Sequence, residues 1–301
     1  MKTEVILLTC AVTLTLAVSP AAHGQVVLSG TNYTQNFNTI SNGLPPGWTV
    51  RTNATTTSLG LPASFPTGAK SWGDNTGGFG NCAGTVANVG TNYCGVESAT
   101  PVQSGTTNRC LAVRQAGATS SFPGSDPGAA FVFQIANTIG FSNLTFSVDL
   151  SLLRTNSNAT TWIIDYAVGD TPAVFTPLGT NSDPGVFGTT NRSFTLKTDA
   201  DNQTNNVWIR VVALSAATGG GSRETFGIDN FVLSYVGAVT VTPVPLFIQF
   251  DGQNAVLIWN DSTFALQATP SLADTFTNVT GATSPFTNAL DAPAKFFRLI
   301  H

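Results

Sequence analysis

The chain has 301 residues, of which 42% are hydrophobic and only 9% are charged, and its formal net charge is −4. Its 12 Lys and Arg residues form no basic stripe, which argues against nucleic acid and against an anionic membrane surface as partners. The only histidines are His23, in an N-terminal export segment, and the last residue, His301. Because histidine is the usual general base and zinc ligand, its absence elsewhere excludes Ser-His-Asp, Cys-His and His-zinc chemistry.

Residues 1–24 predict a secretory signal peptide. Lys2 supplies the positive end, residues 5–18 form the apolar core, and Ala22-His23-Gly24 is a small-x-small cleavage site before Gln25. The apolar core is shorter than the roughly 20 residues that span a bilayer, and no later run is long enough. We therefore expect a secreted or cell-surface protein with no transmembrane segment after cleavage.

The first strand signal covers residues 34–40. From about residue 59 to residue 126 the chain is rich in Gly, Asn, Thr and Ser, which predicts a long loop-rich excursion packed against a sheet. Three cysteines lie in or beside it. Cys82 and Cys94 share a Gly/Asn-rich loop and are the preferred disulfide pair, whereas Cys110 begins an apolar run and is expected to be a buried thiol. A three-cysteine metal site would lack its fourth ligand.

Apolar and polar residues alternate along residues 144–152, 161–168 and 207–214. A period of two with one apolar face is typical of half-buried antiparallel strands, and no helical stripe follows the leader. The sequence thus predicts an all-β protein in which residues 25–236 form a two-sheet antiparallel β-sandwich of jelly-roll type. Residues 237–245 have linker composition, and residues 246–301, with five short strand signals, predict a small C-terminal β module.

Several segments of the predicted sandwich resemble secreted bacterial jelly rolls of the lectin-like and carbohydrate-binding kind. They are TGGF (76–79), RCLAVRQ (109–115), DPGAAF (126–131), TWIIDY (161–166) and TFGIDNF (225–231). The resemblance implies that the first strand, near Asn36-Phe37, pairs with the last, near Ile228-Asp229-Asn230. It identifies the fold rather than the activity, because jelly rolls host many functions.

The tail is similar to a short C-terminal module of exported proteins from Verrucomicrobia-like bacteria. The matching segments are VLIW (256–259), FALQAT (264–269), GATSP (281–285) and FFRL (296–299). This resemblance implies a role in sorting, anchoring or packing, so we expect any ligand site to lie in the larger domain. The competing interpretation is that the tail completes the sandwich core.

Carboxylate catalysis has few candidates. Beyond the leader the only glutamates are Glu97 and Glu224, and the clustered E-x-D-x-E signature of jelly-roll glucanases is absent. Asp149 and Asp165 would form a pair of the kind that glycosidases use if their strands were neighbours. The alternative interpretation is that both are solvated aspartates on the outer face of a sheet.

Aromatic residues are the other candidates for sugar contact. The strand pattern places Trp162 in the core, so its truncation should cost far more stability than truncation of Arg210 on an outer face. Trp208 shares that outer face with Arg210, where the pair would stack on a sugar ring and donate hydrogen bonds. Val212 and Leu214 follow on the same face. The alternative is therefore that the loop-rich excursion covers this face.

Calcium has two weak candidate sites. Residues 199–205 concentrate oxygen ligands but lack the full D-x-D-x-D-G run and its distal glutamate. The second candidate is Asp229, near the last strand. The resemblance implies that its partner ligand lies near the first strand, where this sequence has Asn36 or Asn38 rather than an acidic residue. The alternative is that Asp229 caps a turn or pairs with Arg223. We expect no cofactor other than a structural calcium.

The leading hypothesis is an exported, non-catalytic β-sandwich that binds a polysaccharide or another cell-surface component, with Asp149, Asp165, Trp208 and Arg210 as candidate contacts. A structural or adhesive surface protein without a small ligand is the alternative. A carboxylate-based glycoside hydrolase is a more distant one.

Overall fold

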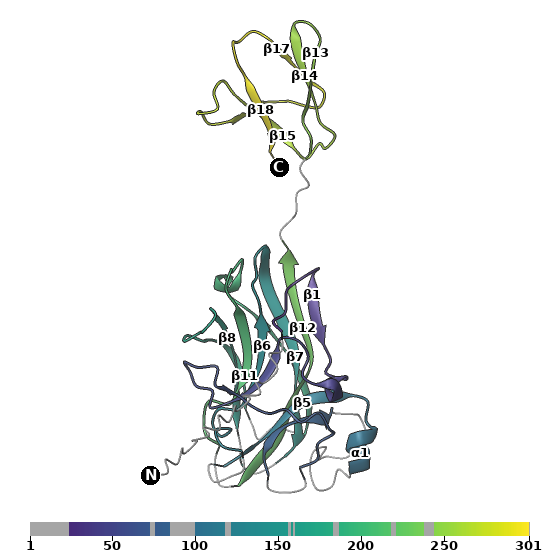
Figure 1. Cartoon of the computed structure of the whole chain (residues 1–301), viewed down its shortest axis with the longest axis vertical. Helices are drawn as coiled ribbons and strands as arrows, with labels where there is room; N and C mark the ends of the chain where they lie inside the picture. The colour runs from purple at the N-terminus through teal and green to yellow at the C-terminus, as the bar shows by residue number, and fades with distance from the viewer. Residues whose placement is uncertain are drawn as a thin grey trace, which may run out of the picture. The chain divides into compact units, whose positions relative to one another are not determined.

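The computed structural model describes residues 24–72, 76–84, 100–117, 122–155, 158, 160–182, 187–217, 221–237 and 244–300 (Figure 1). The chain divides into two compact units, Met1–Ala238 and Val239–His301. The predicted signal peptide lies outside the described residues except for Gly24, and it stays a prediction. No helix within the described ranges is long and apolar enough to cross a membrane.

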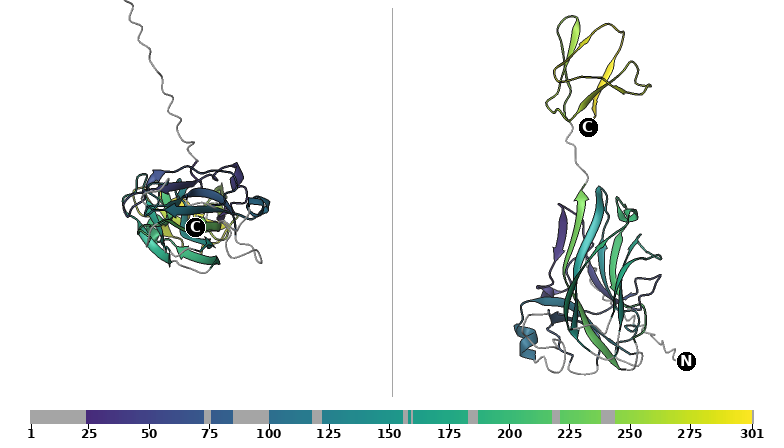
Figure 2. Two further views of the ribbon diagram at one scale, coloured as in Figure 1. Left: turned by 90° about the horizontal axis from the view of Figure 1, so that it is seen from below. Right: turned by 180° about the vertical axis from the view of Figure 1, so that it is seen from behind.

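The larger unit consists of two antiparallel sheets, seen from further sides in Figure 2. The first, here called the β12 sheet, has the order β10-β7-β12-β5-β4, with β1 also paired to β12. Its strands are β1 (Asn32–Gln35), β4 (Gly78–Ala83), β5 (Arg109–Ala116), β7 (Phe141–Arg154), β10 (Gly188–Thr195) and β12 (Ser222–Gly237).

The second, the β11 sheet, has the order β3-β2-β6-β11-β8-β9. Its strands are β2 (Trp48–Thr52), β3 (Leu61–Pro62), β6 (Ala130–Ile135), β8 (Thr161–Val168), β9 (Thr176–Ser182) and β11 (Val207–Val212). Three short helices lie between strands: η1 (Ile40–Asn42), α1 (Thr100–Gly105) and η2 (Thr198–Ala200). The fold is the predicted all-β jelly-roll sandwich, and its first strand β1 pairs with its last strand β12.

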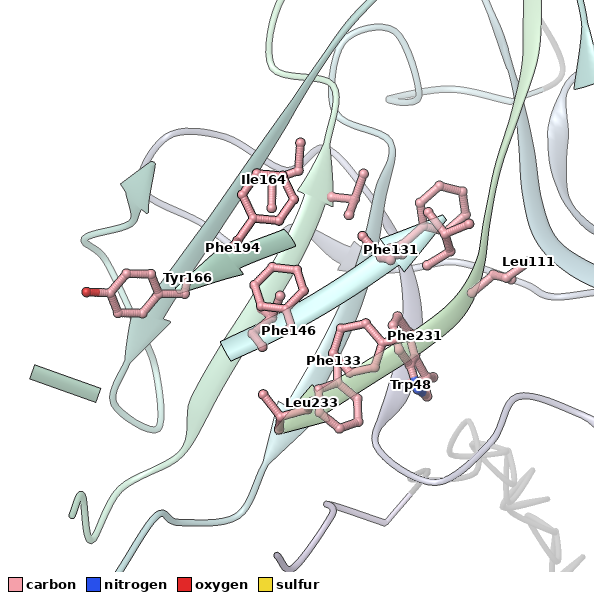
Figure 3. Close-up of a cluster of buried hydrophobic side chains, with 14 of the residues drawn as sticks. Trp48, Leu111, Phe131, Phe133, Phe146, Ile164, Tyr166, Phe194, Phe231 and Leu233 are labelled. Atoms are coloured by element: carbon pink, nitrogen blue, oxygen red, sulfur yellow. The ribbon is translucent and has the colours of Figure 1, made fainter. Parts of the chain in front are cut away.

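The core between the sheets follows the alternation that the sequence shows. On β7, the inward residues Leu144, Phe146, Val148 and Leu150 are buried, and so is Trp162 on β8. Figure 3 shows how aromatic side chains from both sheets meet in this core. The Trp162 ring stacks on Phe226 of β12 with ring centroids 4.4 Å apart, so it joins one sheet to the other.

Two strand predictions were wrong in their bounds. The strand expected over residues 34–40 ends at Gln35. Phe37 has a left-handed backbone (φ 53°), its N–H donates to the Gln35 side chain, and η1 follows. The expected irregular excursion contains β4 and β5, which complete the β12 sheet. β4 (GFGNCA) has little strand propensity of its own, but all of its residues after Gly78 are buried, so tertiary packing decides its conformation.

The smaller unit has two three-stranded antiparallel sheets, ordered β13-β14-β17 and β16-β15-β18. Its strands are β13 (Phe247–Phe250), β14 (Asn254–Ile258), β15 (Ala265–Thr269), β16 (Thr277–Asn278), β17 (Phe286–Ala289) and β18 (Phe296–Ile300). They enclose a small core of Ala255, Leu257, Trp259 and Leu266. Strand β17 was not predicted from the sequence, because this four-residue strand directly after Pro285 has no long alternating run.

Candidate functional site

The four candidate contact residues do not form one site. Asp149 lies on the outer face of β7 in the β12 sheet, whereas Asp165, Trp208 and Arg210 lie on β8 and β11 in the other sheet. Asp149 and Asp165 are therefore not on neighbouring strands, which was the condition for a glycosidase-like pair. Of the other carboxylates, Glu97 lies outside the described residues and Glu224 is buried on β12.

Asp165 and Arg210 are directly opposite each other on neighbouring strands and form a buried ion pair. Arg210 Nε and Nη2 donate to the two carboxylate oxygens at 2.8 and 2.7 Å, and Nη1 donates to the carbonyls of Thr55 and Ser58. The Arg210 and Asp165 side chains are 0% and 3% exposed, and the guanidinium lies 3.3 Å from the ring centroid of Phe175. Burial raises the pKa of Asp165, while its bonds to Arg210 act in the opposite direction.

Trp208 is enclosed on the same outer face. It packs in a cluster with Ala54, Ala130, Val132 and Val212, and its indole N–H donates to the Gly169 carbonyl at 2.7 Å. The expectation of an open outer face is thus wrong for Trp208, Arg210 and Asp165, because residues 54–59 fold over it. These three residues bind parts of the chain rather than presenting a surface.

Asp149 and Asp229 are opposite each other on the outer face of the β12 sheet. Asp149 accepts hydrogen bonds from Asn191 Nδ2 at 2.7 Å and Asn230 Nδ2 at 2.8 Å. Asp229 is buried and accepts only the backbone N–H of Asn230 among the bonds described. Burial raises the pKa of Asp229 to about 7; the Asn230 N–H acts against this shift and the charge of Asp149 adds to it.

The two calcium candidates have other contacts. Asp199 accepts a hydrogen bond from the Tyr166 hydroxyl, and Asp201 accepts one from the Asn143 N–H at 3.0 Å, so both carboxylates bind residues of neighbouring strands. Asp229 does not pair with Arg223, which instead forms a buried ion pair with Asp126. The described residues contain no group of three or more His, Cys, Asp or Glu side chains placed to hold a metal.

The cysteine prediction is met in part. Cys82 is disulfide-bonded, and Cys110, on the neighbouring strand β5, has a free and buried thiol. Burial, with the nearby charge of Asp229, raises the pKa of the Cys110 thiol far above its ordinary value, so the thiol is unreactive. Cys94 lies outside the described residues, and its pairing with Cys82 stays a prediction.

A pocket of about 440 Å³, here called the aromatic pocket, lies where the edge strands β3 and β4 of the two sheets face each other. Its size is within the range of about 300–1,000 Å³ that is usual for small-molecule sites. It is lined by Thr52, Pro62, Ala63, Ser64, Pro66, Lys70, Trp72, Gly77, Gly78, Phe79, Phe122 and Pro123.

Trp72 is fixed in the wall of the aromatic pocket. It is 0% exposed, and its carbonyl accepts hydrogen bonds from Arg114 Nη1 at 2.9 Å and Arg154 Nη1 at 3.3 Å. Its buried indole N–H has no hydrogen-bond partner among the residues described. Buried donors are nearly always paired, so this unpaired N–H is an exception within a fully buried side chain.

Phe122 forms another wall and is only half-buried. It packs edge-on against Phe79, with ring centroids 5.4 Å apart. The turn that carries it is held in place: its carbonyl accepts the buried Ser125 hydroxyl, and Gly124 has a left-handed backbone (φ 73°) where a Cβ would lie 2.0 Å from the Asn53 side chain. No strand pattern in the sequence predicts this pocket, since all of its lining residues except Thr52 fall in the predicted irregular excursion.

The sequence matches no protein-family model and no curated protein. Solved structures similar to the chain include a xylan-binding domain of carbohydrate-binding module family 22, at 15% identity and TM-score 0.37, covering 71% of this chain and 99% of that one. A cleaved adhesin domain of Lys-gingipain from Porphyromonas gingivalis is 14% identical, with TM-score 0.37 and coverages of 69% and 100%.

A third similar structure is the N-terminal part of endo-1,4-beta-D-xylanase 10B from Clostridium thermocellum, with a family 22 module and a GH10 module complexed with xylohexaose. It is 11% identical, with TM-score 0.35; 69% of this chain is covered, and this chain spans only 29% of that one. At these identities and TM-scores the likenesses assign no residue of this chain to a site.

Proposed function

We propose that this protein is an exported, non-catalytic glycan-binding protein and that its sugar site is the aromatic pocket. The observation that carries the proposal is the pocket of about 440 Å³ with the half-buried ring of Phe122 in its wall, backed by the buried rings of Phe79 and Trp72. A sugar ring has apolar C–H faces that pack on aromatic rings and hydroxyls that accept hydrogen bonds. Phe122 offers an aromatic ring to such a face, and Thr52 and Ser64, which also line the pocket, carry hydroxyl groups.

The pocket also has the rigidity that a binding site needs. Trp72 is held by two arginines, and Phe122 stands on a turn fixed by Ser125, Gly124 and the Asp126–Arg223 ion pair. A preformed wall loses little conformational entropy when a ligand binds. The described residues that line the pocket include no Asp or Glu.

Binding can be tested with the mature chain, residues 25–301, on a glycan array and then by calorimetry with the best neutral glycan. Phe122→Ala should weaken that binding by about 1–2 kcal/mol, which is roughly five- to thirtyfold in Kd. The matched control is Phe141→Ala, which truncates another half-buried phenylalanine outside the pocket, and its Kd should stay within about twofold of the wild type.

Each alternative function has its own signature in the same experiment. A flat array would contradict glycan binding and support a structural or adhesive surface protein. New reducing ends on incubation with a bound glycan would show hydrolysis. Equal losses of affinity in Phe122→Ala and Phe141→Ala would place the site outside the aromatic pocket.

We further propose that the unit Val239–His301 is accessory and that the larger unit binds alone. Each unit has a separate hydrophobic core. A chain cut at Val241, residues 25–241, should unfold cooperatively and keep the glycan affinity of the full chain. A fragment that aggregates or melts without a transition would show that the two units fold together.

A further inference from the structure

A second pocket, of about 410 Å³, is polar and has a buried cation in its wall. We call it the arginine pocket. It is lined by Asn38, Ser41, Thr67, Gly68, Ala69, Asn81, Ser104, Thr106, Thr107 and Arg109. Ten residues from four separate segments converge here, and none of them is aromatic or acidic, so its chemistry differs from that of the aromatic pocket.

Arg109 is 6% exposed and is held by backbone and amide oxygens. Its Nε donates to Asn81 Oδ1 at 2.7 Å, and Nη2 donates to the Asn81 carbonyl at 2.9 Å. Nη1 donates to the carbonyls of Gln103 and Thr106. These are four bonds, and a guanidinium has five N–H groups, so one N–H of Nη2 remains available.

The charge of Arg109 is not neutralised by a carboxylate within the part of the chain that the structure describes. The two ion pairs among the described residues are those of Arg210 and Arg223, and the arginine pocket contains no Asp or Glu. In both of those pairs the buried guanidinium faces an aspartate. A buried charge without a counter-charge costs free energy, which an anionic ligand would offset. Burial also lowers the pKa of Arg109 relative to its ordinary value.

We propose that the arginine pocket binds a carboxylate-bearing sugar residue, a hexuronic acid, with its carboxylate on Arg109. One guanidinium matches one negative charge and binds carboxylates through directed N–H groups. The rim supplies neutral hydroxyl groups of Ser41, Thr106 and Thr107 for the sugar hydroxyls. The pocket is also much larger than a bare anion needs.

This site is independent of the aromatic pocket, although consecutive residues of one segment line the two: Pro66 and Lys70 the aromatic pocket, Thr67 to Ala69 the arginine pocket. Phe122→Ala should therefore leave uronate binding unchanged. Changes at Thr107 should leave the binding of a neutral glycan at the aromatic pocket unchanged. The two proposals can then fail separately.

The test uses calorimetry of residues 25–301 with trisaccharides of galacturonic, glucuronic, mannuronic and guluronic acid, the neutral trisaccharides of the corresponding hexoses, and inorganic phosphate. At least one uronate should bind about tenfold more tightly than its neutral counterpart, and this preference should shrink as salt rises. Absence of any uronate binding, equal affinity for charged and neutral sugars, or tighter binding of phosphate would overturn the proposal.

Two variants of an exposed rim residue locate the site. Thr107 is exposed and makes no described side-chain hydrogen bond, so its replacement should leave the fold intact. Thr107→Glu places a negative charge at the mouth of the arginine pocket and should weaken uronate binding at least about tenfold, whereas the isosteric, neutral Thr107→Gln should stay within about threefold of wild type. Equal affinities for the two variants would place the uronate elsewhere. Arg109→Gln should abolish binding, but it also removes four structural bonds, so the Thr107 pair is the decisive comparison.

Discussion

The outer faces of the two sheets carry buried aspartates that differ in their partners. On the β11 sheet, the two carboxylate oxygens of Asp165 accept hydrogen bonds from Nε and Nη2 of Arg210. On the β12 sheet, Asp229 is buried beside Asp149, a second carboxylate, and the pKa of Asp229 is raised to about 7. Burial raises the pKa of both aspartates; the neighbouring Arg210 opposes that shift at Asp165, whereas the charge of Asp149 adds to it at Asp229. Three predictions test this comparison between Asp165 and Asp229.

The largest expected effect is on the paired face. Arg210→Ala would leave Asp165 buried without its counter-ion and should lower the free energy of unfolding by about 3–5 kcal/mol. That is as much as we expect from Trp162→Ala in the core, where truncation leaves a cavity and costs about 3–5 kcal/mol. Denaturant unfolding at pH 7 measures both. A loss below about 1 kcal/mol for Arg210→Ala would show that the pair is solvated, as on an exposed sheet face.

This equality reverses the sequence-based expectation that Arg210 would cost far less than Trp162. The strand period did assign the faces correctly: Trp162 points between the sheets and Arg210 points outward. It failed to reveal that the outward face is covered, because the cover comes from residues 54–59, a turn segment about 150 positions earlier in the chain. Period two distinguishes one face from the other; it does not say which face meets water.

The candidate site shows the same limit. Trp208 and Arg210 were selected as an exposed pair, and their enclosure by that turn segment removes them from any surface. The residues of the aromatic and arginine pockets come mostly from turns and from the ends of strands in both sheets, such as Pro62 of β3 and Arg109 of β5. Their convergence depends on pairing between distant segments, such as Lys70 N–H with the Asn81 carbonyl at 2.8 Å. No local periodicity encodes such a pairing.

The second prediction concerns pH and the unpaired face. Asp229 has a pKa near 7 in the folded protein against an ordinary value of 3.8, so between about pH 4 and pH 7 the folded state holds a proton that the unfolded state has lost. The contribution of Asp229 to stability is therefore greatest at low pH, falls as pH rises through this window and is constant above it. Asp229→Asn removes the ionisable group and should raise stability at pH 8 by about 2–4 kcal/mol.

The matched control is the same substitution on the paired face. Asp165→Asn removes the charge that neutralises Arg210 and should destabilise the protein at pH 8, opposite in sign to Asp229→Asn. Unfolding curves of both variants from pH 4 to pH 8 test this. If Asp229→Asn has the same effect at pH 5 and pH 8, Asp229 is not the titrating group. The other titratable groups at that position are Asp149 and Cys110.

The smallest expected effect concerns Asn230, the residue after Asp229, and separates the contribution of its backbone conformation from that of its side-chain hydrogen bond. Asn230 has a left-handed backbone (φ 45°) at a register shift in the β12–β7 pairing, and its side chain donates to Asp149 Oδ2. Asn230→Gly keeps the left-handed conformation but loses that bond, and should cost about 0.5–1.5 kcal/mol. Asn230→Ala loses the bond and also adds left-handed strain, so it should cost about 1 kcal/mol more. Denaturant unfolding at pH 7 measures both losses, and equal stabilities of Asn230→Gly and Asn230→Ala would contradict left-handed strain at this position.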